Sequence, residues 1–253
     1  MQDLKGRRVL VTGAAGGIGS GAVRALAEAG ATVVGVRHKT EPSADIAKLA
    51  TAWLQGDLSD QGVANSVVDE AAKLMGGLDA LVHPGGTWRP AAPETLTEAD
   101  LDFLIGANLK STVFTNQAAF RHMKPQGRGR IVNFGSLEGV QGNPNAAAYA
   151  SVRAAVHAWT RSAARAFGPS GVNVNAIAPA AQSALADFFK STLSKEALAE
   201  IEQGIKRNVP IFGRLGDPYE DIAPVVLFLV SDASHFVTGQ LVPVDGGMMM
   251  LGA

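Results

Sequence analysis

Short apolar segments rich in β-branched residues alternate along the chain with longer segments in which apolar residues recur every three or four positions. The short segments predict strands, and the longer ones predict amphipathic helices. The expected strands are 8–12, 31–36, 78–83, 130–134, 172–177 and 241–244, and the expected helices include 18–29, 148–167 and 218–230. This alternation predicts an α/β fold with a single doubly wound parallel sheet and helices on both faces.

One stretch interrupts the alternation of strands and helices. Within residues 179–210 there are two short amphipathic segments, 185–192 and 195–207. An insertion at this point lies above the carboxyl ends of the strands, where open α/β sheets bind their ligands. The length of the chain suits one large domain. We therefore expect a single domain, residues 1–253, with a substrate lid at about 180–210.

The composition narrows the classes of partner. A formal net charge of −1 gives no electrostatic reason to expect nucleic acid or an anionic membrane surface. The longest apolar run, 225–230, is too short to span a bilayer, and the polar first residues show no signal-peptide pattern. Cysteine is absent, which fits a cytoplasmic protein, and the five histidines lack metal-ligand spacing. We expect a small-molecule partner and no metal.

The junction between the first strand and the first helix is rich in glycine. Residues 12–19 are Thr-Gly-Ala-Ala-Gly-Gly-Ile-Gly. A Cβ there would block close approach of a phosphate, or of the helix to the strand. A tight turn that binds nothing is the alternative, but the position favours a pyrophosphate at the helix N-terminus. We expect Gly13, Gly17, Ile18 and Gly19 to contact this dinucleotide.

Two further positions bear on the identity of the dinucleotide. The second strand ends near Arg37, where an NAD-preferring protein would carry an acid for the ribose 2′-hydroxyl. A guanidinium favours a 2′-phosphate, so we expect NADP(H) over NAD(H), unless Arg37 is only a solvated loop cation. Asp57 and Leu58 end the expected third strand, where Asp57 could bind the adenine amino group. Asp57 could equally cap the next helix, and Asp60 competes for that position.

The whole chain resembles the short-chain dehydrogenase/reductase family. The matching motifs are TGAAGGIG at 12–19, GDLSD at 56–60, ANLKST around Asn108, IVNFGS ending at Ser136, YASVR at 149–153, NVNAIAP at 173–179, and GRLGDPYEDIA and TGQLVPVDGG near the carboxyl terminus. The resemblance implies a Rossmann-type sheet, an NAD(P) cofactor and a small carbonyl or alcohol substrate.

The resemblance also implies catalytic residues. In the family a serine orients the substrate carbonyl, a tyrosine exchanges the proton, a lysine holds the nicotinamide ribose, and an asparagine supports a water relay. Ser136, Tyr149 and Asn108 match these positions, but Arg153 stands where the family has lysine. Arg153 lies one helical turn after Tyr149, and a fixed cation there favours the phenolate. A guanidinium cannot pass on a proton as an ammonium can. We therefore expect the replacement of lysine by Arg153 to affect the proton relay most.

Two other motifs depart from the family pattern. His83-Pro84-Gly85-Gly86 replaces the usual Asn-Asn-Ala-Gly, so Gly85 is expected near the cofactor and the bracing by asparagine is lost. His83 is either a titrating acid or base or, as we favour, a hydrogen-bonded residue at the strand end. Pro179-Ala180 replaces the Pro-Gly pair that is common beside the nicotinamide, and Pro179 is expected to contact the cofactor.

These observations favour an NADPH-dependent reductase of ketones or aldehydes, acting equally as an alcohol dehydrogenase, with Tyr149 as proton donor. A second hypothesis is non-redox chemistry, because the Ser–Tyr–Arg set resembles that of halohydrin dehalogenases. Those enzymes fill the cofactor site with an aromatic residue, whereas this chain keeps Gly17 and Arg37. A third is a catalytically weak cofactor-binding protein.

The sequence says less about the substrate pocket and the assembly than about the cofactor site. The pocket is expected to be lined by the lid at 184–189 together with Trp88, Leu137, Glu138, Gln141 and Asn143. Glu138 and Gln141 either contact a polar substrate or belong to a surface loop. The resemblance implies a homotetramer or homodimer with residues 108–123 and 148–167 at one interface, and the apolar end 248–251 fits burial against another subunit.

Overall fold

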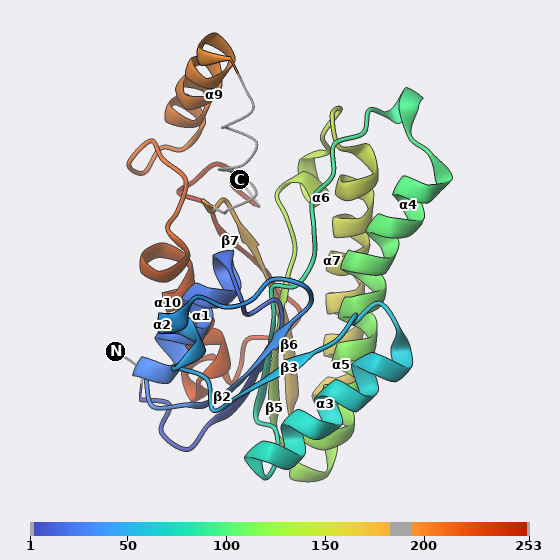
Figure 1. Cartoon of the computed structure of the whole chain (residues 1–253), viewed down its shortest axis with the longest axis vertical. Helices are drawn as coiled ribbons and strands as arrows, with labels where there is room; N and C mark the ends of the chain where they lie inside the picture. Colours follow the sequence, from blue (N-terminus) through green and yellow to red (C-terminus); the bar gives the residue numbers. More distant parts are fainter. Residues whose placement is uncertain (1–2, 183–193, 252–253) are drawn as a thin grey trace.

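The seven strands form one parallel sheet in the order β3-β2-β1-β4-β5-β6-β7. The structure, a computed structural model, describes residues 3–182 and 194–251 (Figure 1). The strands are β1 (Arg8–Val11), β2 (Thr32–Arg37), β3 (Ala52–Gln55), β4 (Ala80–His83), β5 (Gly129–Phe134), β6 (Val172–Pro179) and β7 (Leu241–Val244). The strand order reverses between β1 and β4, which is the switch point at which open sheets bind ligands. The predicted fold class is confirmed.

Helices cover both faces of the sheet. They are α1 (Gly17–Glu28), α2 (Ala44–Ala47), α3 (Gln61–Met75), α4 (Glu98–Leu104), α5 (Ser111–Gln126), α6 (Glu138–Gln141), α7 (Ala147–Phe167), α9 (Lys195–Asn208) and α10 (Ala223–Val230). Helices α1, α2 and α10 lie on one side, and α3, α5 and α7 on the other (Figure 1). No helix in the described ranges is long and apolar enough to cross a membrane.

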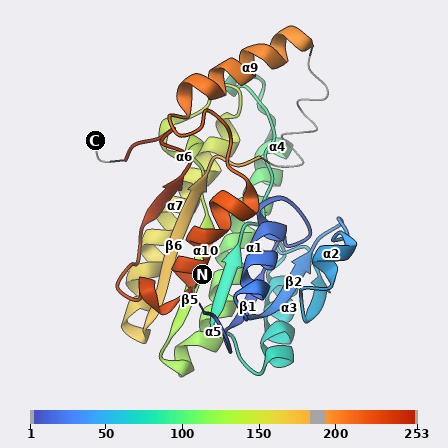
Figure 2. The same cartoon turned by 90° about the vertical axis from the view of Figure 1, so that its left-hand side faces the viewer.

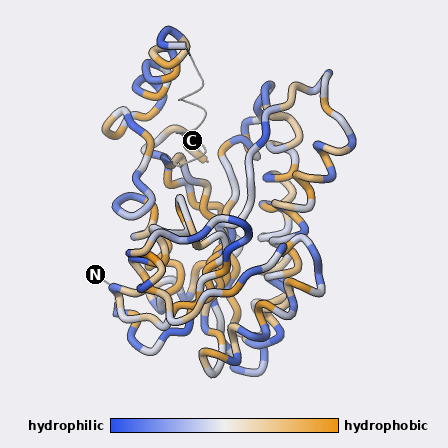
Figure 3. Tube along the Cα trace, in the orientation of Figure 1, coloured by the Kyte–Doolittle hydropathy of each residue, from blue (hydrophilic) through white to orange (hydrophobic). Residues whose placement is uncertain are grey.

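The alternation of side chains along β1 divides the core into two layers. Val9 and Val11 pack into the cluster beneath α1 and α10, whereas Leu10 packs into the cluster beneath α3, α5 and α7. Successive strand residues point to opposite faces, so a strand covered on both sides is apolar at every position. Hydrophobic positions accordingly gather along the central strands (Figure 3).

One predicted helix differs from its expected form, and one predicted amphipathic segment forms a helix. The helix expected at 218–230 opens as a π-helical turn, η4 (Pro218–Ile222), before α10. Pro224 has no N–H to donate to the carbonyl of residue 220, so the regular ladder begins only after η4. The segment expected at 195–207 is helix α9, capped by Ser194, and stands beyond the carboxyl ends of the strands (Figure 2). The segment expected at 185–192 lies outside the described residues.

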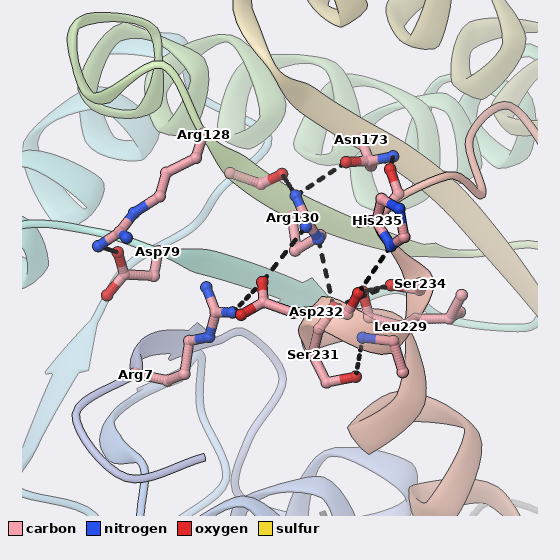
Figure 4. A network of polar contacts seen from close by, with 12 residues as sticks. Arg7, Asp79, Arg128, Arg130, Asn173, Leu229, Ser231, Asp232, Ser234 and His235 are labelled. Atoms are coloured by element: carbon pink, nitrogen blue, oxygen red, sulfur yellow. Dashed lines mark hydrogen bonds and ion pairs between the residues drawn. The ribbon is translucent and has the colours of Figure 1, made fainter. Parts of the chain in front are cut away.

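A polar network closes the amino end of the sheet (Figure 4). Arg130 of β5 donates from Nη1 to Asn173 Oδ1 of β6 at 2.8 Å, and from Nε to the carbonyl oxygen of Ser231 at 3.4 Å. Asp232 forms ion pairs with both Arg130 and Arg7. The network therefore joins two strands to the turn after α10 and to the segment before β1.

The neighbouring pair Arg8–Asp79 joins β1 to β4. Asp79, only 2% exposed, accepts hydrogen bonds from Arg8 Nε at 2.7 Å, Arg8 Nη2 at 2.8 Å and the Arg8 backbone N–H at 3.0 Å. Burial alone would raise the pKa of Asp79, but the Arg8 hydrogen bonds and the charges of Arg8 and Arg128 outweigh burial and lower it. The ionised carboxylate is therefore the form that the fold stabilises.

We predict that Asp79→Asn lowers the free energy of unfolding by about 2 kcal/mol at neutral pH, because the buried side chain loses the charge that strengthens its hydrogen bonds from Arg8. The folded-state pKa of Asp79 lies below its unfolded value of about 3.9, so its contribution is complete above that pH and is lost as pH falls through the folded pKa. Urea unfolding at pH 7 and below pH 4 should show the difference between variant and wild type shrinking in acid.

The matched control is Asp69→Asn, since Asp69 pairs with Arg121 and His122 on the exposed surface. That change should cost less than about 1 kcal/mol. Equal effects of the two substitutions would refute the role given to Asp79.

Candidate functional site

Glycines bring three backbone segments into contact at the carboxyl end of β1. Gly13 has φ +55°, and a Cβ on it would lie 3.0 Å from the Cα of Gly85 after β4. A Cβ on Gly19 would lie well inside van der Waals contact with the Gly13 carbonyl oxygen. Gly16, the N-cap of α1, supplies no side-chain acceptor for the first amides of the helix. These amides are therefore available to an anion.

His83, at the end of β4, contacts this junction through the side chain of Thr12. Its Nδ1 lies 2.7 Å from Thr12 Oγ1, and its Nε2 lies 3.4 Å from Ser111 Oγ. The Ser111 hydroxyl donates to the carbonyl of Ala107, so we assign the proton to His83 Nε2 and the donor role to Thr12. Burial, with the nearby charge of Arg153, lowers the pKa of His83 to about 3. The imidazole is neutral, and its contacts support the hydrogen-bonding role rather than that of a titrating acid.

Asn108 lies on a π-helical turn, η2 (Ile105–Lys110), between α4 and α5. Such turns occur frequently at functional sites. The fully buried Asn108 amide accepts from the Thr87 backbone N–H at 3.0 Å and donates to the Leu104 carbonyl at 3.0 Å. Thr112 donates to the Asn108 backbone carbonyl at 2.6 Å. Asn108 thus holds the chain that follows β4, where a Cβ on Gly86 would lie 2.5 Å from Asn108 Oδ1.

Ser136 lies just after β5, and Tyr149 lies in α7. Ser136 follows β5, and its Oγ accepts from the Glu138 backbone N–H at 3.1 Å. The Ser136 backbone N–H donates to His157 Nε2 at 3.2 Å. Tyr149, in the first turns of α7, is 9% exposed and makes no hydrogen bond through its hydroxyl in the part of the chain that the structure describes. Its hydroxyl is available to a bound molecule.

Arg153 is buried beside Tyr149. It is 6% exposed, and the centre of its guanidinium lies 5.1 Å from the centroid of the Tyr149 ring. Its Nη1 donates to the Phe134 carbonyl oxygen at 2.7 Å, while its buried Nε has no hydrogen-bond partner among the residues that the structure describes. Within residues 3–182 and 194–251, no carboxylate forms a salt bridge with it. The site therefore contains a buried cation whose hydrogen bonds are incomplete.

Sequence reasoning missed His157 and the carbonyl of Phe134. His157 lies four residues after Arg153 and eight after Tyr149, so all three occupy one face of α7. Burial, with the charges of Arg161 and Arg153, lowers the pKa of His157 to about 4. This spacing could have revealed His157, but no sequence pattern marks which backbone carbonyl a guanidinium meets.

The second and third strands end beside the expected adenosine position. Arg37, at the end of β2, has Nη1 at 2.8 Å from Glu41 Oε1. Asp57 Oδ1 accepts from the Ser59 hydroxyl at 2.7 Å and the Ser59 backbone N–H at 3.0 Å, and these bonds lower the pKa of Asp57. Asp60 caps α3 by accepting from the Val63 N–H, so the alternative of a helix-capping role for Asp57 is wrong.

The remaining predicted cofactor contacts lie at or near strand ends. Ile18 packs against the core beneath α1, and Leu58 packs against the core beneath α3. Pro179 ends β6 opposite Val244 of β7, and Ala180 donates its N–H to the Val244 carbonyl at 3.1 Å. The Pro179-Ala180 pair is thus fixed to the sheet, at the end where Arg37 and Gly13 lie.

Comparisons with known proteins agree on one family. Residues 13–249 match a family model described as enoyl-(acyl carrier protein) reductase. The chain is 36% identical to cis-4-hydroxycyclohexanecarboxylate dehydrogenase of Sinomonas cyclohexanicum, covering 95% of this chain and 96% of that one. It is 32% identical to the 3-oxoacyl-(acyl-carrier-protein) reductase FabG of Thermotoga maritima, covering 98% and 99%. It is 34% identical to gluconate 5-dehydrogenase of Gluconobacter oxydans, covering 97% and 96%.

A solved structure gives the same result. A crystal structure assigned to a short-chain alcohol dehydrogenase of Sinorhizobium meliloti 1021 superposes with a TM-score of 0.88 at 36% identity, covering 97% of each chain. The motif resemblance, the sheet order and these matches coincide over nearly the full length. The chain belongs to the short-chain dehydrogenase/reductase family and is an oxidoreductase of that type.

Proposed function

We propose that this protein is an NADPH-dependent reductase of ketones or aldehydes that also oxidises the corresponding alcohols. The observation that carries the proposal is the convergence of Ser136, Tyr149 and Arg153, all buried, beside the backbone held by Asn108. The proposal adds a cofactor preference and a class of substrate to the family assignment.

The glycine-lined junction fits a dinucleotide. Gly13, Gly19 and Gly85 leave no room for a Cβ within the junction, and the first amides of α1 lack a side-chain acceptor. The unpartnered Nε of Arg153 is a donor suited to a ribose hydroxyl. Gly13, Gly17, Ile18 and Gly19 would hold the pyrophosphate, and Asp57, Leu58, Gly85 and Pro179 would line the rest of the site. The bound nicotinamide would supply or accept the hydride.

Ser136 and Tyr149 would act on the substrate oxygen. The Ser136 hydroxyl accepts one backbone bond and keeps its proton to donate to a carbonyl oxygen. The Tyr149 hydroxyl, free of other partners in the described ranges, would donate the proton during reduction and take it back during oxidation.

Arg153 would act as a fixed cation. It lies against the Tyr149 ring and favours negative charge that develops on the phenol oxygen. Because a guanidinium does not release a proton, any proton that leaves the site must pass through another group or through water. Asn108, with both ends of its amide already bonded, would position the backbone after β4 rather than carry protons on its side chain.

The dehalogenase hypothesis gains no support. The reported relatives are dehydrogenases and reductases. Gly17 has φ +51°, a conformation that an aromatic residue would rarely adopt. The relatives that we report likewise give no support to a non-catalytic cofactor-binding protein.

We also propose a lid, an assembly and a location for this protein. Residues at about 180–210 would form the lid, because α9 stands beyond the carboxyl ends of the strands. A homodimer or homotetramer would cover Phe236, Met250 and Leu251, which are 94%, 69% and 46% exposed. A cytoplasmic location would fit the absence of cysteine.

We predict that Tyr149→Phe lowers kcat by at least about 100-fold, because it removes the only proposed proton donor while preserving the ring against Arg153. Steady-state oxidation of NADPH with a panel of ketones and aldehydes measures the loss. As a control, fluorescence titration of NADPH should give nearly the same Kd for variant and wild type. A variant that keeps the turnover of wild type would exclude Tyr149 as the donor.

We predict that Arg37→Asp reverses the cofactor preference and changes the ratio of NADPH to NADH affinities by about 100-fold, because it replaces a partner of the 2′-phosphate with a like charge. Isothermal titration with each cofactor measures the ratio. The control is Glu41→Gln, which removes the carboxylate that now pairs with Arg37 and should keep or strengthen the preference for NADPH. An unchanged ratio in Arg37→Asp would contradict the assignment.

A further inference from the structure

Glu138 lies next to the catalytic serine. It is the first residue of α6, two positions after Ser136, and its backbone N–H donates to Ser136 Oγ. Helix α6 lies at the end of the molecule where α9 stands (Figure 1). The side chain is half-buried, and the charge of Arg153 acts on its carboxylate, which therefore lies within electrostatic range of the proposed reacting groups.

The protein satisfies this carboxylate only partly. Trp88 donates its indole N–H to Glu138 Oε2 at 3.4 Å, which is a long hydrogen bond. Burial raises the pKa of Glu138, and the hydrogen bonds from Asn143 and Trp88 and the charge of Arg153 counteract that rise only in part. A half-buried carboxylate costs stability at this position, and a neutral residue would avoid the cost.

We propose that Glu138 is a specificity-determining residue that accepts a hydrogen bond from a hydroxyl group of the substrate, so that the preferred substrates are uncharged hydroxylated ketones, aldehydes and polyols. The inference rests on the proposed function, because it places the substrate carbonyl at Ser136 and Tyr149.

The selection follows from the charge of the carboxylate. A hydrogen bond from a hydroxyl to an ionised carboxylate is roughly twice as strong as one between neutral groups. A substrate carboxylate in the same place would meet a like charge in partly desolvated surroundings, where repulsion is stronger than in water. One residue therefore favours the hydroxylated substrate and disfavours the anionic one.

Three ring ketones of similar shape test the proposal. Cyclohexanone, 4-hydroxycyclohexanone and 4-oxocyclohexanecarboxylate are compared with NADPH as the reductant, in wild type and in Glu138→Gln. We expect wild type to favour the hydroxylated ketone over cyclohexanone by about tenfold in kcat/KM. Relative to cyclohexanone, the variant should lose most of this preference and gain about tenfold on the carboxylate. Its Kd for NADPH, measured by fluorescence titration, reports whether the fold is intact.

The matched control is Glu94→Gln, at an exposed glutamate on the turn η1 (Pro93–Thr95), which should leave all three rates unchanged. Substrate ratios in Glu138→Gln equal to those of wild type would overturn the role of Glu138 and leave the reductase assignment intact. Wild-type turnover confined to the carboxylate, or absent for both neutral ketones, would also overturn it. Failure of wild type to bind NADPH would remove the proposed function itself.

Discussion

The site depends on a guanidinium that is buried without a carboxylate partner in the described part of the chain. Arg153 is 6% exposed, bonds to one backbone carbonyl and leaves its Nε unsatisfied. Moving an unpaired ion out of water costs several kcal/mol, and a single hydrogen bond to a carbonyl recovers only part of it. Natural proteins leave buried polar groups without hydrogen-bond partners mainly where function requires it. The rest of the site is arranged around this cation.

The neighbours of Arg153 avoid adding positive charge. Burial lowers the pKa of His83 to about 3 and that of His157 to about 4, and the charge of Arg153 adds to both shifts, so both rings are neutral at physiological pH. Each neutral ring makes a structural contact: His83 with Thr12 of the glycine-rich turn, and His157 with the Ser136 backbone. Tyr149 offers its ring face to the cation. Within the described ranges no carboxylate forms a salt bridge with the cation, and Glu138 acts on it only through longer-range charge, so negative charge on a bound molecule or on the phenol oxygen would complement it.

The sequence predicted most of the fold because the strands are buried on both faces and their apolar runs are unambiguous. The strand at 241–244 and the helix starting at residue 195 match the structure, and most other boundaries move by one or two residues. The π-turns η2 and η4 were not expected, since wide turns leave no periodic pattern. The family motifs predicted that Ser136, Tyr149, Arg153 and Asn108 belong to one site. The sequence alone could not decide whether Asp57 or Asp60 caps α3, because aspartate is a good N-cap at either position. Only the backbone conformation selects one of them.

We propose that Arg153 serves the reaction at a cost to stability. Replacing Arg153 with methionine fills similar volume without charge, so urea unfolding of the cofactor-free protein should show a free energy of unfolding equal to wild type or up to about 2 kcal/mol higher. The same variant should lose NADPH-dependent turnover. A loss of more than about 2 kcal/mol of stability would contradict the account, because it would show that the fold itself requires the arginine.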